Sequence, residues 1–257
     1  MELFDALFAK KYGINIGGSV YDELLGEYTA KLAPPTPTMP SKGDVIAVDM
    51  NGDGTAENYL VLKVNGSVAE VLARANLGEE SVFGAYNTYA NSTLDTLLNN
   101  SYYSTLSNIA KSAIIDKTFK QDSWYYGTSG NPSYNGLYGA SNKAYQVSLG
   151  SGAFGNEITR HIYAISVQDV IDYLGVTTEM TSADTTLNML SIQAMVDDAD
   201  NNDFWLSSAN AGGADKAMSI ACFNGFIYFR GVATTNTKVR PAFQLDLTKI
   251  EWSPVTA

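Results

Sequence analysis

Two Asn-Gly pairs, at 65–66 and 224–225, interrupt short apolar runs, and they constrain the fold more than any other feature. Such a pair supplies positive φ at both central positions of a two-residue turn, so it favours a tight hairpin. The runs at 44–48, 59–64 and 68–73 therefore predict an N-terminal β-meander. Later runs predict a C-terminal antiparallel sheet, with strands at 204–206, 218–223, 226–229 and 239–245.

Helical spacing appears between these β-rich ends. Ser92 and Asp95 form a variant of the capping box, ahead of leucines that share one helical face. The segment 104–115 repeats that spacing. Ser166 caps a third helix, which is predicted to run from Val167 to Leu174 and to stop at Gly175. A weaker helix is predicted at 187–196 and a strand at 161–165. The predicted class is α+β, with two to four helices.

The N-terminal segment differs from the rest of the chain. Residues 1–12 have the spacing of a short amphipathic helix, and the Pro-rich stretch 33–40 can enter neither a helix nor a central strand. We therefore divide the chain into an anchor helix and Gly/Pro-rich linker, 1–41, and a main domain, 42–257. An alternative is that the helix packs back onto the main domain.

Charge and composition exclude several classes of protein. Against 27 acidic residues stand 16 basic ones, a formal charge of −11, which argues against a nucleic-acid partner. No apolar run reaches the roughly 18 residues that span a bilayer, so no membrane insertion is expected. The first apolar residues have no basic residues before them, so we expect synthesis in the cytoplasm without a secretory signal.

One segment suggests a metal. The run 49–54 matches the first half of a calcium loop, in which oxygen ligands alternate and glycine takes the sixth position. The twelfth position holds Leu60 where a glutamate is needed, and Glu57 comes three places early. A polar hairpin loop is therefore the favoured interpretation. No cofactor is expected, and Ca²⁺ is the one candidate ion, with Asp49, Asn51, Asp53 and Glu57 as its ligands.

Residues suited to catalysis are few. His161 is the only histidine, it stands in an apolar run, and the chain has no Gly-x-Ser-x-Gly motif. Cys222 is the only cysteine and is interpreted as a small buried hydrophobe. Arg240 is predicted to be buried and structural, and Trp205 to lie in the core. We therefore expect no enzymatic activity.

The segment 121–157 is rich in Tyr, Gly, Ser and Asn and has little periodicity, so it is predicted to be a long loop. Rigid rings among small polar residues are typical of recognition surfaces. The alternative is that the rings attach the loop to the core. The candidate contact residues are Trp124, Tyr125, Tyr126, Tyr134 and Tyr138.

The motifs Phe204-Trp205-Leu206-Ser207-Ser208 and Lys238-Val239-Arg240-Pro241-Ala242-Phe243 resemble the closing signature of C-type-lectin-like modules of the formylglycine-generating-enzyme type. The resemblance covers roughly residues 42–250. The first twelve residues resemble leaders of tailed-phage structural proteins. Lacking paired cysteines, the chain cannot have the oxidase activity of sulfatase-activating enzymes. It also lacks Glu-Pro-Asn, Gln-Pro-Asp and Trp-Asn-Asp, so the calcium-dependent sugar site of lectins cannot be carried over.

The resemblance implies a scaffold that phages use for host attachment, in some cases diversified by retroelements. It implies display positions at Asn210, Asp215, Asn224, Tyr228, Arg230 and Asn236. The expected function is a non-enzymatic virion protein that binds a host cell-surface receptor, either protein or glycan. Its N-terminal segment would contact other virion proteins, and a homo-oligomer, perhaps a trimer, is expected. Alternatives are a structural tail or capsid-decoration protein and a cell-wall glycan hydrolase that uses acids such as Asp122 or Glu157.

Overall fold

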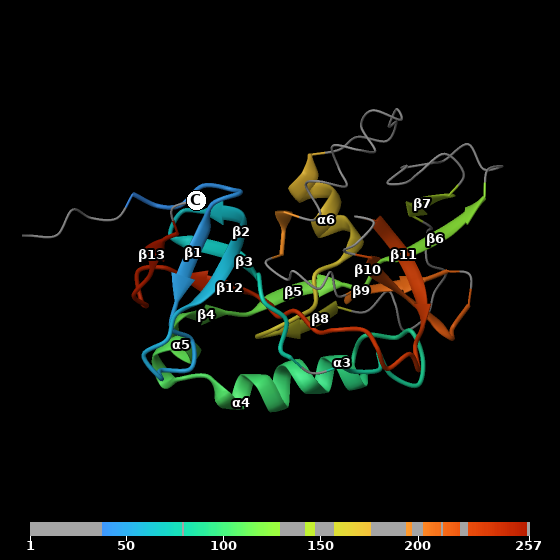
Figure 1. The fold of residues 1–257 in the computed structure, drawn as a ribbon, viewed down its shortest axis with the longest axis horizontal. Helices are drawn as coiled ribbons and strands as arrows, with labels where there is room; N and C mark the ends of the chain where they lie inside the picture. The colour runs from blue at the N-terminus through green and yellow to red at the C-terminus, as the bar shows by residue number, and fades with distance from the viewer. Residues whose placement is uncertain are drawn as a thin grey trace, which may run out of the picture. The chain divides into compact units, whose positions relative to one another are not determined.

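A six-stranded antiparallel sheet has the order β13-β1-β2-β3-β12-β4 (Figure 1). The computed structural model describes residues 38–78, 80–128, 142–146, 157–175, 194–196, 203–211, 213–221 and 226–255. Strands β1 (Val45–Val48), β2 (Glu57–Asn65) and β3 (Val68–Ala73) form the predicted meander. The sheet is completed by β4 (Ile114–Ile115), β12 (Ala242–Asp246) and β13 (Ser253–Pro254).

The β2–β3 hairpin is confirmed, but its turn differs from the predicted one. Asn65 pairs with Val68, so the two turn residues are Gly66 and Ser67. Gly66 has a φ of 60°, whereas Asn65 is not among the residues with positive φ. Positive φ at the first central position alone is typical of a type II′ turn, and glycine adopts this φ without steric strain.

A five-stranded sheet has the order β11-β10-β9-β6-β7. Strands β9 (Phe204–Asn210), β10 (Lys216–Ala221) and β11 (Phe226–Gly231) are the predicted C-terminal antiparallel strands. The turn residues 222–225 lie outside the described residues. The prediction of a long loop at 121–157 is wrong in part, because β6 (Ser123–Thr128) and β7 (Asn142–Gln146) pair with each other, and β6 runs parallel to β9.

The helices are short. Helix α3 (Thr93–Thr96) continues into a π-helix, η1 (Leu97–Tyr102), and into α4 (Tyr103–Thr105), so the three form one rod (Figure 1). As predicted, Ser92 caps α3. The helix predicted over 104–115 is confirmed only as the shorter α5 (Asn108–Ala113), because Leu106 is extended and α5 begins behind the Ser107 cap.

The third predicted helix is confirmed as α6 (Val167–Leu174), with a capping box of Ser166 and Asp169 and a left-handed Gly175 at its end. The strand predicted at 161–165 is absent from this described segment, where Tyr163 makes only an isolated bridge to Ala242. A two-stranded sheet precedes it, formed by β5 (Lys117–Lys120) and β8 (Glu157–Arg160). The architecture is therefore α+β, with more sheet than helix.

Aromatic rings and one arginine fill the core. Trp205 is 1% exposed, as predicted, and its ring meets that of Phe83 edge to face at a centroid distance of 5.6 Å. Arg240 is also 1% exposed; it donates to the main-chain oxygen of Arg74 and stands over the ring of Phe204. The prediction of a buried, structural Arg240 is confirmed.

Residues Pro40–Ala257 form one compact unit. The predicted anchor helix and most of the linker fall within 1–37, outside the described residues, as does most of the helix predicted at 187–196. Within the described ranges, no helix has the length and apolarity needed to cross a bilayer.

Candidate binding cleft

A cleft of about 930 Å³ opens between α6 and the face of the six-stranded sheet. Strands β2, β3 and β12 contribute Lys63, Glu70 and Gln244, and helix α6 contributes four residues that begin with Asp169 in its first turn. Residues of both charge signs line its wall. The lining residues are Lys42, Leu62, Lys63, Glu70, Asp116, Lys117, Thr118, Asp169, Ile171, Asp172, Tyr173, Gly175 and Gln244.

Lys117 lines this cleft and stands between two acids. Its Nζ lies 2.6 Å from Oε1 of Glu70 and 3.1 Å from Oδ1 of Asp169, and its side chain is 16% exposed. Burial alone would lower the pKa of Lys117, but the two carboxylates outweigh it and raise the pKa. Lys117 is therefore a fixed cation at neutral pH.

Tyr163 contacts both Glu70 and Lys117. Its hydroxyl donates to Oε1 of Glu70 at 2.8 Å, and Lys117 Nζ stands 4.5 Å from the centroid of its ring. Burial, reinforced by the charge of Glu70, raises the pKa of Tyr163 well above its ordinary value, so the phenol stays neutral and donates. Glu70, with two donors at one oxygen, is held in place.

The register of the strands and the cap of α6 explain why these groups meet. Glu70 lies opposite Lys63 across β2–β3 and opposite Gln244 across β3–β12, so three neighbouring strands place their polar residues in one row. Asp169 is at the third position of α6. One of its oxygens accepts from the main chain of Ser166 as part of the cap, and the other binds Lys117. The helix cap therefore also positions a cleft residue.

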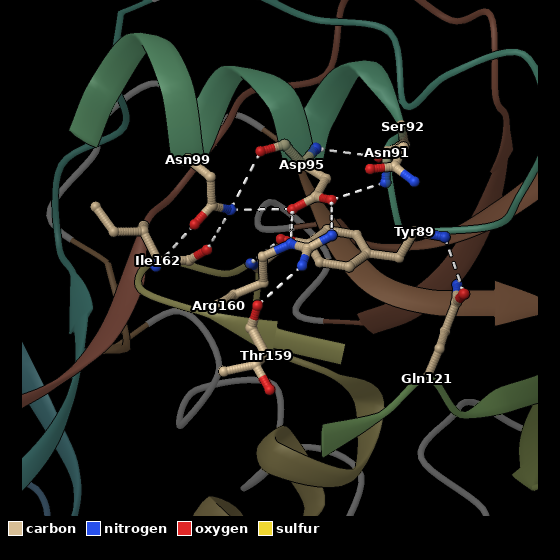
Figure 2. A network of polar contacts seen from close by, with 10 residues as sticks. Tyr89, Asn91, Ser92, Asp95, Asn99, Gln121, Thr159, Arg160 and Ile162 are labelled. Atoms are coloured by element: carbon tan, nitrogen blue, oxygen red, sulfur yellow. Dashed lines mark hydrogen bonds and ion pairs between the residues drawn. The ribbon is translucent and has the colours of Figure 1, made fainter. Parts of the chain in front are cut away.

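A second polar cluster fixes the helical rod to β8 (Figure 2). Asp95 is 3% exposed, and Arg160 binds it through two nitrogens, Nε and Nη2, each at 2.7 Å. Asn99 donates to the Asp95 side chain at 2.9 Å and to the main-chain oxygen of Ile162 at 2.7 Å. Two parallel charge-assisted hydrogen bonds in a buried setting orient the rod.

A hollow of about 390 Å³ adjoins this cluster, and His161 is one of the residues that line it. Nδ1 of His161 contacts a carboxylate oxygen of Asp116, and the ring stacks on Tyr103 at a centroid distance of 4.6 Å. The predicted structural role for His161 agrees with these contacts.

Comparison with known families can now be set beside this geometry. Residues 60–247, more than two thirds of the chain, match the family described as a domain of unknown function, DUF6273. The chain belongs to the DUF6273 family. The match begins in β2 and ends just after β12, so it contains every cleft residue except Lys42. No curated protein and no solved structure matches this chain.

The predicted contact residues of this DUF6273 domain fall into three groups. Trp124 and Asn210 require correction: they are 0% and 2% exposed, and Trp124 donates its Nε1 hydrogen to Asp122 at 2.6 Å. They are core residues and do not face a ligand. Tyr125 and Tyr126 lie in β6 and Tyr228 lies in β11. Outside the described residues lie Tyr134, Tyr138 and Asn224.

Three predicted display positions of the DUF6273 domain lie near its surface. Asp215 and Asn236 are exposed. Arg230 forms an ion pair with Asp203 and donates to the side chain of Asn236 at 3.1 Å. The structure thus brings Arg230 and Asn236 together, but as partners of each other.

The predicted calcium loop is a hairpin loop between β1 and β2 whose oxygens accept main-chain hydrogens. Asp49 accepts from the amides of Gly52 and Gly54 at 2.7 and 2.9 Å, and Asp53 accepts from that of Thr55 at 2.7 Å. Among the residues that the structure describes, no group of three His, Cys, Asp or Glu could hold a metal ion.

The other two proposed ligands also have partners in this loop. Asn51 donates to Asp53 at 3.0 Å, and Glu57 accepts from the amide of Met50 at 3.1 Å. Calcium binding here stays a prediction, which a titration of Ca²⁺ against melting temperature checks.

The two acids named for a hydrolase, Asp122 and Glu157, lie in different surroundings. Asp122 accepts from Trp124 and from the hydroxyl of Ser208, and burial raises its pKa. Glu157 is exposed on β8 opposite Lys120 and lines none of the hollows described here. Sequence reasoning missed Glu70, Lys117 and Asp169. Only Glu70 has a signal in the sequence, as a charged residue inside the otherwise apolar strand Val-Ala-Glu-Val-Leu-Ala.

Proposed function

We propose that this DUF6273 protein is a non-enzymatic binding protein of a tailed phage or prophage, and that it recognises a host-surface glycan. In this proposal its α+β domain is C-type-lectin-like, and its N-terminal segment attaches it to other virion proteins. The observation that carries the proposal is the cleft of about 930 Å³, in whose wall Lys117 is already held by two acids.

The paired charges favour an uncharged ligand. At Lys117, an anionic ligand would have to compete with Glu70 and Asp169, and a cationic ligand would have to compete with Lys117 for these two acids, at the cost of a part-buried ion pair. A glycan offers hydroxyl groups that both donate and accept, which suits a wall of mixed polarity. The formal charge of −11 further disfavours polyanionic ligands.

The same geometry supports binding over hydrolysis. A glycosidase needs two carboxyl groups that face the scissile bond, one to donate a proton and one to attack or to activate water. Here the ammonium group of Lys117 stands between Glu70 and Asp169 and takes an oxygen of each. Neither acid is open to a sugar ring placed between them.

The proposal is tested by binding the labelled full-length chain to an array of neutral and anionic bacterial surface polysaccharides. We expect neutral polysaccharides to bind, and we expect Tyr173→Ala and Gln244→Ala, both in the cleft wall, to weaken binding about tenfold. Lys249→Ala is the matched control, because Lys249 is exposed and lines none of the hollows described above. An empty array, or equal loss in the control, would refute the proposal.

Release of reducing sugar from the bound polysaccharide would instead support the hydrolase alternative. Binding restricted to purified virion proteins would support the structural tail or decoration alternative. Mass spectrometry of purified particles tests the proposed location on the virion.

A homo-oligomer, perhaps a trimer, is part of the proposal, because several weak sites on one particle act together with a high effective concentration. Light scattering of the full-length chain tests it. A monomeric mass would be compatible with binding at a single site, but it would contradict binding by several sites that act together.

A further inference from the structure

We infer that the glycan carries an acetamido group, as an N-acetylated amino sugar does, and that a hollow of about 200 Å³ beside the cleft receives this group. This inference rests on the proposed function and adds the class of sugar. The hollow shares Lys63, Glu70 and Gln244 with the cleft. Its volume lies below the roughly 300–1,000 Å³ of pockets for drug-sized ligands, so it suits one substituent of a ligand that lies in the cleft.

The strand register gathers the residues that line this hollow. Glu70 lies opposite Gln244, and Gln244 lies opposite Ile115. Residues that are directly opposed share one face of a sheet, and so do residues two apart on one strand. Val68 precedes Glu70 by two residues and pairs with Asn65. All of these side chains therefore lie on one sheet face, and all of them line the hollow.

Two carboxamide groups line this hollow without a hydrogen-bond partner among the residues that the structure describes. They belong to Asn65, which is exposed, and to Gln244, which is half-buried. A carboxamide has both a donor and an acceptor. An acetamido group has one of each as well, so it can form two hydrogen bonds with one carboxamide. A ligand that covers Gln244 without such bonds would leave polar atoms dry and unpaired, which is unfavourable.

The same hollow also has an apolar part, formed by Val68 and Ile115. Both side chains are half-buried, and both are branched at Cβ and therefore stiff. A hydroxyl group would find no partner on these aliphatic groups, whereas a methyl group would be removed from water there. The carboxamides and the aliphatic side chains together match the N–H, C=O and CH₃ of one acetamido group.

Charge at the hollow favours this neutral substituent over a carboxylate. Lys63 is exposed and would attract an anion, but Glu70 lines the same space. Lys117 and Tyr163 both donate to Oε1 of Glu70, and no contact of its Oε2 is made by any described residue. The negative charge of Glu70 would repel a carboxylate in the hollow, whereas an amide N–H can donate to Oε2.

The test compares chemical forms of one polysaccharide. The neutral polysaccharide that binds most strongly in the array is expected to contain acetamido groups. It is de-N-acetylated, and its amines are then converted back to acetamido groups or to formamido groups. We expect the re-acetylated form to bind like the parent. The formamido form, which lacks only the methyl group, should bind about fourfold more weakly. The free amine should bind about tenfold more weakly or worse.

Variants assign these differences to the hollow. Gln244→Met keeps the length of the side chain and removes its hydrogen bonds, so it should reduce the preference for the acetamido form over the free amine about tenfold. Asn65→Ala should reduce it in the same direction. Val68→Thr replaces a methyl group by a hydroxyl group, so it should narrow the difference between the acetamido and formamido forms. Asn58→Ala is the matched control, because Asn58 is an exposed carboxamide on the same strand as Asn65 and lines none of the hollows described here.

The possible outcomes separate this inference from the proposed function. Bound polysaccharides without acetamido groups, equal binding of the acetamido and amine forms, or equal effects of Asn65→Ala and Asn58→Ala would overturn the inference and leave a neutral-glycan site. An array without any bound polysaccharide would overturn the proposed function itself. Asn65 is exposed, so Asn65→Ala is expected to keep the melting temperature of the parent chain and carries the test if Gln244→Met does not fold.

Discussion

At the scale of single residues, Arg160 is the side chain on which the buried Asp95 depends. Replacing it, as in Arg160→Met, leaves a carboxylate with a 4% exposed side chain and only neutral donors from Asn91 and Asn99. Loss of one partner of a buried ion pair costs about 3–5 kcal/mol, and the partial exposure of Arg160 argues for the lower value. Urea denaturation measures the loss.

Two further variants make this prediction specific. In Arg160→Met/Asp95→Asn the orphaned charge is gone, so part of the lost stability should return. Lys249→Met, which breaks an exposed pair with Asp246, should cost less than about 1 kcal/mol. A loss in Arg160→Met no larger than in Lys249→Met would show that the bidentate pair does not anchor the helical rod.

Asp122 gives the protein a pH-dependent component of stability. Burial raises its pKa, although hydrogen bonds from Ser208 and Trp124 work against the rise. The folded state therefore holds a proton that the unfolded state releases between the ordinary pKa and the raised one, and stability falls as pH rises through that window. Asp122→Asn should flatten the fall in a series of urea midpoints from about pH 4 to 7. Ser208→Ala removes a hydrogen bond that lowers the pKa of Asp122, so the fall in stability should extend to higher pH. A profile in Asp122→Asn as steep as in the parent would contradict this account.

At the scale of secondary-structure elements, the sequence predicted those features that depend on residues close to one another in the chain. The capped helix α6 and the β2–β3 hairpin were predictable, because Ser166, Gly175 and Gly66 act within a few residues. Strands β6 and β7 were not, because Tyr, Gly, Ser and Asn give no alternation there and β6 is a strand through its partners β7 and β9. The extended Leu106 that ends the rod has no local signal either.

The β1–β2 loop allows a matched comparison of two glycines. Gly52 and Gly54 have φ of 81° and 89°, so alanine at either position is strained by about 1 kcal/mol. At Gly52 the added methyl group would also lie 3.1 Å from Cβ of Ser107, whereas at Gly54 it would meet open space. We therefore expect Gly52→Ala to lower the melting temperature more than Gly54→Ala. Equal shifts would show that Ser107 gives way without cost.

At the scale of the whole molecule, the cleft could not be predicted from the sequence. Most of its charged residues come from β2, β3, β5 and α6, and they meet only because the sheet pairs Glu70 with Gln244 and α6 then places Asp169 beside Lys117. Sequence spacing carries no trace of such long-range contacts. The composition of the segment 121–157 predicted a recognition surface, yet Trp124 from that segment belongs to the core.

The net charge makes a last prediction about binding. Because the formal charge is −11 and Lys117 in the cleft wall is paired, a neutral glycan should bind with an affinity that changes less than about twofold between about 0.05 and 0.5 M salt. Screening by salt acts on charge–charge interactions, and a neutral ligand has none to lose. An anionic polysaccharide should be repelled at low salt and should bind, if at all, more tightly as salt is added. Calorimetric titration across this range decides between them, because a steep fall in affinity with salt would mean that Lys42, Lys63 and Lys117 bind an anion and that the ligand breaks the pairing of Lys117 with Glu70 and Asp169.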